Sequence, residues 1–198
     1  MTLLANRVFT TGSATREKLI AVAFDMFGRN GFHGVGLDRI IDGAGVSKQT
    51  FYNHFECKDD LILAVLKFRH SVETTTFIDM MTKLGGDDPA NKLRVLFDAL
   101  HAWYDDPEWH GCIFVTAAAE FPMTNDPAHQ AALEHMRALQ EHLQYLATLA
   151  QARDPKALAE ELTILLEGAI AYRHMTGESR TTDIVKRAAR RLLDEQLS

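Results

Sequence analysis

Polar side chains crowd one short stretch of the chain, residues 47–58, in types and at spacings that suit nucleic-acid chemistry. Phe51 and Phe55 are four residues apart, so on a helix they share one side and can anchor it to a core. The side chains around them then face outward with ammonium, amide and hydroxyl groups, which match base edges and phosphate oxygens. We expect base-edge contacts from Lys48, Gln49, Thr50 and Asn53, and phosphate contacts from Ser47, Tyr52, His54 and Lys58.

Two helices joined by a tight turn would hold these side chains in place. Residues 37–44 carry apolar side chains at helical offsets of three, four and seven, which predicts the first helix. Gly45 then supplies the positive φ that a sharp turn needs, and Ser47 is a suitable N-cap for the second helix. Helix pairs of this kind also occur in proteins that never bind nucleic acid, so the geometry alone leaves the function open.

The stretch AGVSKQTFYNHFECKDDL, residues 44–61, resembles the signature of the TetR family of transcriptional regulators. In that family a glycine turn, SK, T, an aromatic pair, F and a later lysine recur at this spacing, and the resemblance covers roughly residues 15–65. It implies an all-α fold of about nine helices, with an N-terminal three-helix helix-turn-helix domain joined by a long fourth helix to a larger ligand-binding and dimerisation domain. It also implies a homodimer that pairs through its last two helices, a double-stranded operator and a small-molecule effector.

Three positions depart from the family pattern. Gly36 stands where a threonine or serine usually caps the second helix, so we expect no phosphate contact there. Asp38 occupies a place often held by arginine. Cys57 replaces a serine that often caps the fourth helix, and a thiol is the weaker acceptor. A thiol at a helix N-terminus is also a candidate redox sensor, and the alternative is a plain substitution.

Capping and breaking residues predict the other helices. The first helix is expected from a cap at Thr15 to Asn30, the long fourth helix over 58–84 and the last helix over 181–195. Asp-Pro pairs mark three further helix starts, and a short apolar helix is expected within 111–122. The pairs that mark starts are Asp88-Pro89, Asp126-Pro127 and Asp154-Pro155, and the pair that ends the helix from Asp88 is Asp106-Pro107. We expect two domains, residues 1–60 and residues 61–198.

Residues 61–198 are the expected sensor. An aromatic side chain on an apolar helix face is either a pocket wall or ordinary core, and a carboxylate there either binds a ligand or pairs with a cation such as Arg173. Our candidates for effector contacts are Phe68, Phe97, Trp103, Phe114, Glu120, His142 and Glu167.

The net charge of −6 is confined to the predicted sensor. Residues 1–60 hold seven Lys or Arg and seven Asp or Glu, whereas the remainder holds fourteen and twenty. A neutral reading domain should bind DNA weakly without sequence selection. An N-terminal arm, residues 1–13, offers Arg7, Thr10 and Thr11 for a groove or phosphate contact, and a disordered tail is the alternative.

Other function classes lack their signatures. No run of about eighteen apolar residues and no signal peptide is found, so we expect a cytoplasmic protein without a membrane partner. The two cysteines lack CxxC spacing and the nine histidines lack HxxxH spacing, so we expect neither a metal nor a cofactor. No GxSxG, HExxH or Gly-rich phosphate loop suggests an enzyme.

Three readings therefore remain. The first is a repressor released from a palindromic operator by a small ligand, with activation rather than repression left open. The second is a regulator that responds to a redox or protein signal through Cys57 or Cys112. The third is an orphan enzyme or binding protein that carries a vestigial reading domain.

Overall fold

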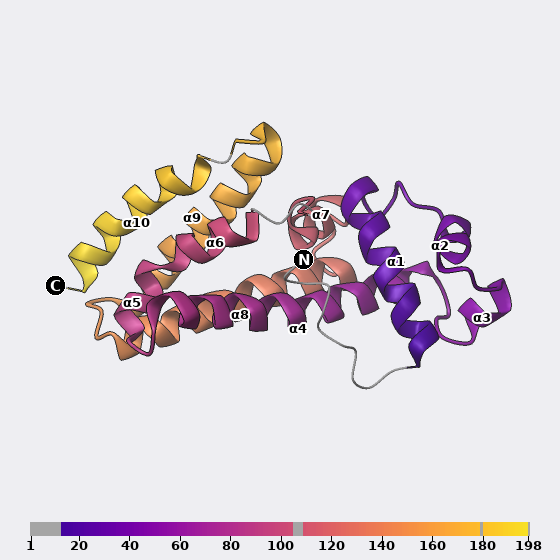
Figure 1. The fold of residues 1–198 in the computed structure, drawn as a ribbon, viewed down its shortest axis with the longest axis horizontal. Helices are drawn as coiled ribbons and strands as arrows, with labels where there is room; N and C mark the ends of the chain where they lie inside the picture. The colour runs from indigo at the N-terminus through magenta and orange to yellow at the C-terminus, as the bar shows by residue number, and fades with distance from the viewer. Residues whose placement is uncertain (1–12, 105–108, 179, 198) are drawn as a thin grey trace. The chain divides into compact units, whose positions relative to one another are not determined.

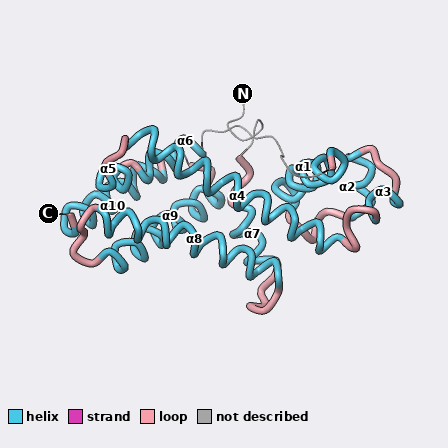
Figure 2. The backbone as a smooth tube through the Cα atoms, turned by 90° about the horizontal axis from the view of Figure 1, so that it is seen from below, coloured by secondary structure: helices cyan, strands magenta, loops and turns pink. Residues whose placement is uncertain are grey.

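The computed structural model describes residues 13–104, 109–178 and 180–197, and within these ranges every regular element is a helix (Figure 1). Ten helices are present in the described residues, coloured as such along the backbone in Figure 2. The predicted all-α class is thereby confirmed. The expected contacts of Arg7, Thr10 and Thr11, and the helix break at Asp106-Pro107, fall outside the described residues.

The first four helices begin and end at residues with clear local reasons. Ser13, not the predicted Thr15, caps the first helix, because the Ser13 hydroxyl accepts a hydrogen bond from Arg16 N at 3.4 Å. Gly31 ends that helix with a φ of 72°. The helices are α1 (Ala14–Asn30), α2 (Leu37–Ala44), α3 (Lys48–Tyr52) and α4 (Lys58–Gly85).

The start of α4 is satisfied without a serine. The Asp60 carboxylate accepts a hydrogen bond from Glu56 N at 3.1 Å, so one backbone donor ahead of the helix is paired although Cys57 stands at the cap position. Asp59 and Asp60 also place negative charge in the first turn, where the helix dipole favours it. The long predicted fourth helix is therefore confirmed.

The three Asp-Pro starts are also confirmed. Each aspartate accepts a hydrogen bond from a backbone N–H of the following turn: Asp88 from Asn91, Asp126 from Ala128 and Asp154 from Ala157. The remaining helices are α5 (Pro89–Arg94), α6 (Leu96–Tyr104), α7 (Ile113–Glu120), α8 (Pro127–Leu149), α9 (Pro155–Thr176) and α10 (Thr181–Gln196).

The prediction of one continuous helix after Asp88 was wrong. Val95, with φ −93° and ψ 5°, separates α5 from α6. The hydrogen bonds continue across it, since Val95 N donates to Asn91 O and Ala99 N donates to Val95 O. Leu93 and Leu96, on either side of the interruption, are both fully buried.

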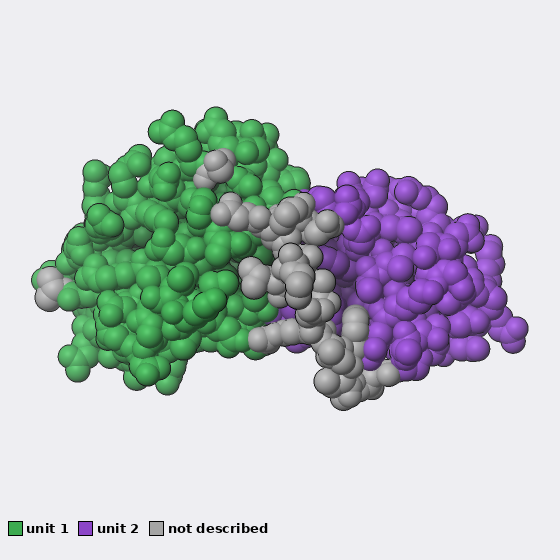
Figure 3. All heavy atoms as spheres, in the orientation of Figure 1, with its two compact units in different colours: residues 1–3, 73–109, 135–198 green, residues 4–72, 110–134 purple. Residues whose placement is uncertain are grey.

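The chain divides into two compact units, drawn in two colours in Figure 3. Unit 1 contains residues 1–3, 73–109 and 135–198, and unit 2 contains residues 4–72 and 110–134. Unit 2 thus joins α1, α2 and α3 to α7, a helix far along the sequence. The domain boundary predicted after residue 60 stays a prediction.

Each unit has its own apolar core. Large side chains that are almost fully buried fill unit 2, among them Leu19, Phe27, Phe32, Ile40, Phe51, Leu61 and Leu66. In unit 1 the α5, α6, α8 and α9 helices contribute Leu93, Leu96, Phe97, Leu100, Leu143, Leu158 and Leu162. Because α10 packs on α5, α6 and α9, these helices form one body.

Candidate nucleic-acid interface

The turn between α2 and α3 has the geometry that the sequence predicts. Gly45 adopts left-handed torsion angles, φ 62° and ψ 39°, and its N–H caps α2 at Asp42 O. Ser47 Oγ then accepts a hydrogen bond from Thr50 N at 3.1 Å and so begins α3. A helix of five residues has little stability of its own, so the turn and cap set its direction.

One side of α3 is anchored in the core and the other is exposed to solvent. Phe51 is fully buried and Phe55 is 5% exposed, as predicted, and their rings lie 5.6 Å apart. Tyr52 is 56% exposed although it is aromatic. The predicted contact residues fall in two groups: Ser47, Lys48, Gln49, Tyr52 and Asn53 are exposed, whereas Thr50, His54 and Lys58 are half-buried.

The hydroxyl groups of Ser47 and Thr50 lie 2.8 Å apart and share a hydrogen bond. Ser47 therefore serves α3 directly as its cap, in addition to any phosphate contact. Thr50 would approach a base with its hydroxyl already oriented, which reduces the entropy lost on binding. Their roles toward DNA stay predictions.

Lys48 has an intramolecular partner that the sequence reasoning missed. Its Nζ lies 2.9 Å from Asp38 Oδ1 in α2, and both side chains are largely exposed. The hydrogen bond to Asp38, and then its negative charge, raise the pKa of Lys48. The unusual aspartate in α2 thus neutralises the cation at the start of the reading helix.

Asp38→Asn is expected to strengthen DNA binding. The change removes a carboxylate that both repels phosphate and occupies Lys48, so binding should tighten by about tenfold or less and the salt slope should steepen by about one ion. Titration of labelled DNA at several salt concentrations measures both quantities. Asp25→Asn, in which the carboxylate paired with Arg29 within α1 is removed, is the charge-matched control.

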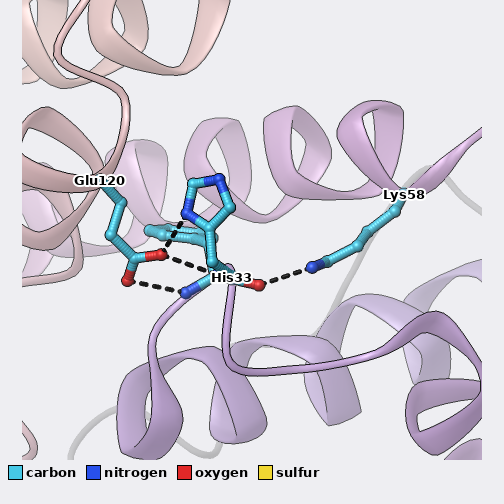
Figure 4. Close-up of polar contacts among 4 residues, drawn as sticks. His33, Lys58 and Glu120 are labelled. Atoms are coloured by element: carbon cyan, nitrogen blue, oxygen red, sulfur yellow. Dashed lines mark hydrogen bonds and ion pairs between the residues drawn. The ribbon is translucent and has the colours of Figure 1, made fainter.

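Lys58 is held inside unit 2. Its Nζ donates to Phe32 O at 2.6 Å (Figure 4). The same Nζ lies 5.9 Å from the centre of the Phe27 ring. The ammonium therefore orders the segment between α1 and α2. The predicted contact between Lys58 and a DNA phosphate stays a prediction. To make it, the ammonium would have to reach the phosphate while still bonded to the Phe32 carbonyl, or break that hydrogen bond first.

Glu120, at the end of α7, binds the same segment from the other side. Its carboxylate accepts hydrogen bonds from Phe32 N at 3.0 Å and from His33 N at 2.7 Å, and His33 Nδ1 lies 2.7 Å from Oε2 (Figure 4). Burial raises the pKa of Glu120, but the His33 and Phe32 hydrogen bonds outweigh it and lower the pKa overall. The structure thus gives the Glu120 carboxylate partners within the chain, and its predicted contact with an effector stays a prediction.

Gly31 makes room for this contact. A Cβ built on Gly31 would lie only 2.2 Å from Glu120 Oε1, and the φ of 72° is itself unfavourable for other residues. Glycine thus ends α1 and admits the carboxylate at the same position. We define the Glu120 carboxylate, the 31–33 backbone and the Lys58 ammonium as the clamp.

Unit 2 also carries exposed cations outside α3. The Lys18 ammonium in α1 lies near the turn, since a Cβ on Gly45 would be 3.8 Å from Lys18 Nζ, and Arg39 in α2 is exposed. Arg16, by contrast, stacks over the Phe55 ring at 4.9 Å. Helical periodicity had marked the core face of α1 but not which outward residues approach the turn.

The other predicted effector residues divide between the two units, and their contacts with an effector stay predictions. Phe68 and Phe114 belong to unit 2, and Phe97, Trp103, His142 and Glu167 belong to unit 1. Phe97 and Phe114 are core side chains, 2% and 4% exposed. Burial, followed by the charge of Lys92, lowers the pKa of His142, and burial raises the pKa of Glu167.

Two features are absent from the described residues. Within them no three His, Cys, Asp or Glu side chains are grouped so as to hold a metal ion. None of the described helices is long and apolar enough to cross a membrane.

The sequence matches two family profiles. Residues 19–65 match "Bacterial regulatory proteins, tetR family", and residues 89–189, about half of the chain, match "Tetracyclin repressor-like, C-terminal domain". The chain belongs to the TetR family. It is therefore a transcriptional regulator with a helix-turn-helix DNA-binding domain, in a family whose members are generally not enzymes.

Individual TetR-family proteins are similar over different lengths. SCO4454, a TetR-family transcriptional regulator from Streptomyces coelicolor, has 26% identity and a TM-score of 0.86 over 93% of this chain and 96% of its own. The activator FasR of Mycolicibacterium smegmatis is 47% identical over 55 residues, 28% of this chain and 25% of FasR. The regulator UidR of Escherichia coli is 30% identical over 83 residues, 37% of this chain and 42% of UidR. The chain thus matches less than half the length of either curated relative.

Proposed function

We propose that this TetR-family regulator is a cytoplasmic homodimeric repressor that binds a palindromic operator and is released by a small-molecule effector. The observation that carries the proposal is the surface of α3, where Lys48, Gln49 and Asn53 are exposed while Phe51 and Phe55 are buried. Two such helices, one from each protomer, would enter successive major grooves about one helical turn or somewhat more apart.

An apolar stripe on α9 supports the homodimer. Ile164 is 72% exposed and Met175 is 75% exposed, and the exposed Gly168 and Tyr172 lie between them at helical spacing on the same side. Nothing lies within 4 Å of a Cβ built on Gly168, so a second helix has room to approach there. A stripe of this kind on an otherwise polar surface suits pairing with its own copy.

Effector control would work through the spacing of the two reading helices. A ligand that binds better to a conformation with the wrong spacing shifts the population away from the DNA-binding state. The coupling is reciprocal, so operator DNA should weaken effector binding by the same factor. Because the relative FasR is an activator, the direction of regulation has to be measured with a promoter-reporter fusion.

Selection of bound DNA from a random pool tests the proposal most directly. Enrichment of a palindrome, followed by its release from the protein by a member of a small-molecule mixture, is the expected result. A protein that retains no DNA at moderate salt would instead fit the vestigial-domain alternative.

Thr50 and Lys58 separate two kinds of contact. Thr50→Ala should weaken operator binding by about 1–3 kcal/mol while nonspecific binding is unchanged, and Lys58→Ala should weaken binding to all sequences and reduce the salt slope by about one ion. Lys58→Ala also breaks the clamp, so its folded fraction must be measured by circular dichroism before affinities are compared. If both variants bind the operator as the parent does at every salt concentration, the assigned interface is wrong.

Exposure of Cys57 favours it over Cys112 for the redox alternative. Cys57 is exposed at the start of α4, whereas Cys112 is buried. Under that alternative, oxidation would weaken operator binding in the parent and not in Cys57→Ser. Thiol titration with DNA binding followed in parallel decides it, since binding that survives full oxidation removes the alternative.

A further inference from the structure

Arg173 of α9 lies among aromatic rings in unit 1. Its guanidinium carbon is 4.8 Å from the centre of the Tyr104 ring and 5.2 Å from that of Trp109. One nitrogen, Nη2, donates to Tyr104 O at 3.1 Å. The aromatic faces and the carbonyl hold the guanidinium plane in one orientation.

The rest of this guanidinium is buried without partners. Arg173 Nε and Nη1 are inaccessible to solvent and make no hydrogen bond, and the same is true of the indole nitrogen of Trp109. No ion pair joins Arg173 to a carboxylate in the part of the chain that the structure describes. Buried donors that lack acceptors destabilise the folded protein, and more so when they are charged. An anion that entered the cluster would remove that destabilisation.

A third aromatic ring, that of Trp103, adjoins the two rings that contact Arg173. The Trp109 ring makes edge contacts with Tyr104 at 5.1 Å and with Trp103 at 5.9 Å. His174, which is exposed, lies 6.4 Å from Trp109 and marks the solvent side of the cluster. Aromatic walls favour a flat ligand, because rings stack or meet edge to face at these distances.

We propose that Arg173, Tyr104, Trp103 and Trp109 form the effector site, and that its ligand is a small aromatic carboxylate. The inference rests on the proposed function, because only a ligand-responsive regulator needs such a site. The guanidinium supplies positive charge and donors for the carboxylate, and the indoles contact the ring. A cationic ligand is excluded from the same walls by the charge of Arg173.

Tryptophan fluorescence provides the test. The chain has two tryptophans, and both lie in this cluster, so a bound ligand should change the intrinsic emission. The full-length protein is titrated with benzoate and, as a neutral isostere, with benzamide. Benzoate should produce a saturable change with an affinity about tenfold or more above that of benzamide.

Variants connect that response to the guanidinium. Arg173→Gln should weaken benzoate binding to the level of benzamide, and Arg173→Lys, which keeps the charge but not the planar donors, should fall between them. Arg190→Gln removes an exposed arginine of α10 and should bind benzoate as the parent does. Circular dichroism confirms that each variant is folded.

Equal responses to benzoate and benzamide, or unchanged benzoate binding by folded Arg173→Gln, would overturn the proposed site. DNA retention is measured in the same samples, so that failure of the proposed effector site can be distinguished from failure of the proposed regulatory function. If benzoate binds through Arg173 and releases the selected DNA, both the effector site and the proposed function are supported. If a neutral ligand releases DNA from both the parent and Arg173→Gln, the proposed regulatory function is supported and the proposed effector site is refuted.

Discussion

Glu120→Ala lowers the free energy of unfolding by about 2–4 kcal/mol, because it removes charge-assisted hydrogen bonds and leaves the Phe32 N–H without an acceptor. The Glu120 side chain is 24% exposed, so solvent replaces its bonds only in part. For a chain of this length such a loss corresponds to a drop of about 4–16 °C in Tm. Urea unfolding followed by circular dichroism measures the free energy.

Two further variants show how much of the loss in Glu120→Ala comes from the clamp. His33→Ala keeps both backbone hydrogen bonds to Glu120 and should be less destabilising than Glu120→Ala. Glu134→Ala, at an exposed position of α8 in the same unit, should change stability by less than about 0.5 kcal/mol. A loss for Glu120→Ala no larger than that of Glu134→Ala would show that the clamp contributes nothing.

The stabilising effect of Glu120 also depends on pH. Its pKa is lowered in the folded protein below the ordinary 4.5, so its contribution is present above the unfolded pKa and is lost as pH falls through the folded pKa. The difference in unfolding free energy between the parent and Glu120→Gln should therefore be largest near neutral pH and shrink in acid. A difference that grows in acid would contradict the assigned contact.

Ile164→Glu is expected to turn the proposed homodimer into a monomer and to weaken binding to the proposed operator by about a hundredfold or more, because a monomer would engage one half-site. A carboxylate at a side chain that is 72% exposed costs little in the monomer but would be desolvated on pairing. Sedimentation velocity measures the mass, and DNA titration measures the affinity.

A matched charge elsewhere provides the control. Gln151→Glu adds the same charge in the exposed loop after α8 and should leave both mass and affinity unchanged. If Ile164→Glu remains a dimer of parental affinity, the stripe on α9 is not the pairing surface, and Tyr145 and Leu149 of α8 become the next exposed apolar positions to test.

Local sequence signals accounted for most of the fold. The turn at Gly45, the cap at Ser47 and the three Asp-Pro starts depend on residues within a few positions of each other, and all were confirmed. Errors arose where a nearby alternative was equally good, as when Ser13 rather than Thr15 capped α1. The interruption at Val95 carries no glycine or proline, so no residue type announced it.

The contacts that organise the interface were not predictable in this way. The Lys48 and Asp38 pair joins two helices whose faces were known but whose mutual rotation was not. Glu120 accepts a hydrogen bond from Phe32 N and Lys58 donates one to Phe32 O, and only the tertiary fold brings these two remote residues to Phe32. Glu120 was a candidate effector contact in the sequence, but its partners Phe32 and His33 could not be inferred there.

Unit 2 is built from two separate segments of the chain, and this affects how it folds during synthesis. Glu120 follows Phe32 by 88 residues, and residues 73–109 between them belong to unit 1. On the ribosome, the DNA-reading unit therefore remains incomplete until its last segment, residues 110–134, has emerged. Closing so long a loop costs entropy that local helix formation does not, so the clamp should form late in folding. A nascent chain that stopped before residue 110 would contain the α3 sequence but would lack the segment that completes unit 2.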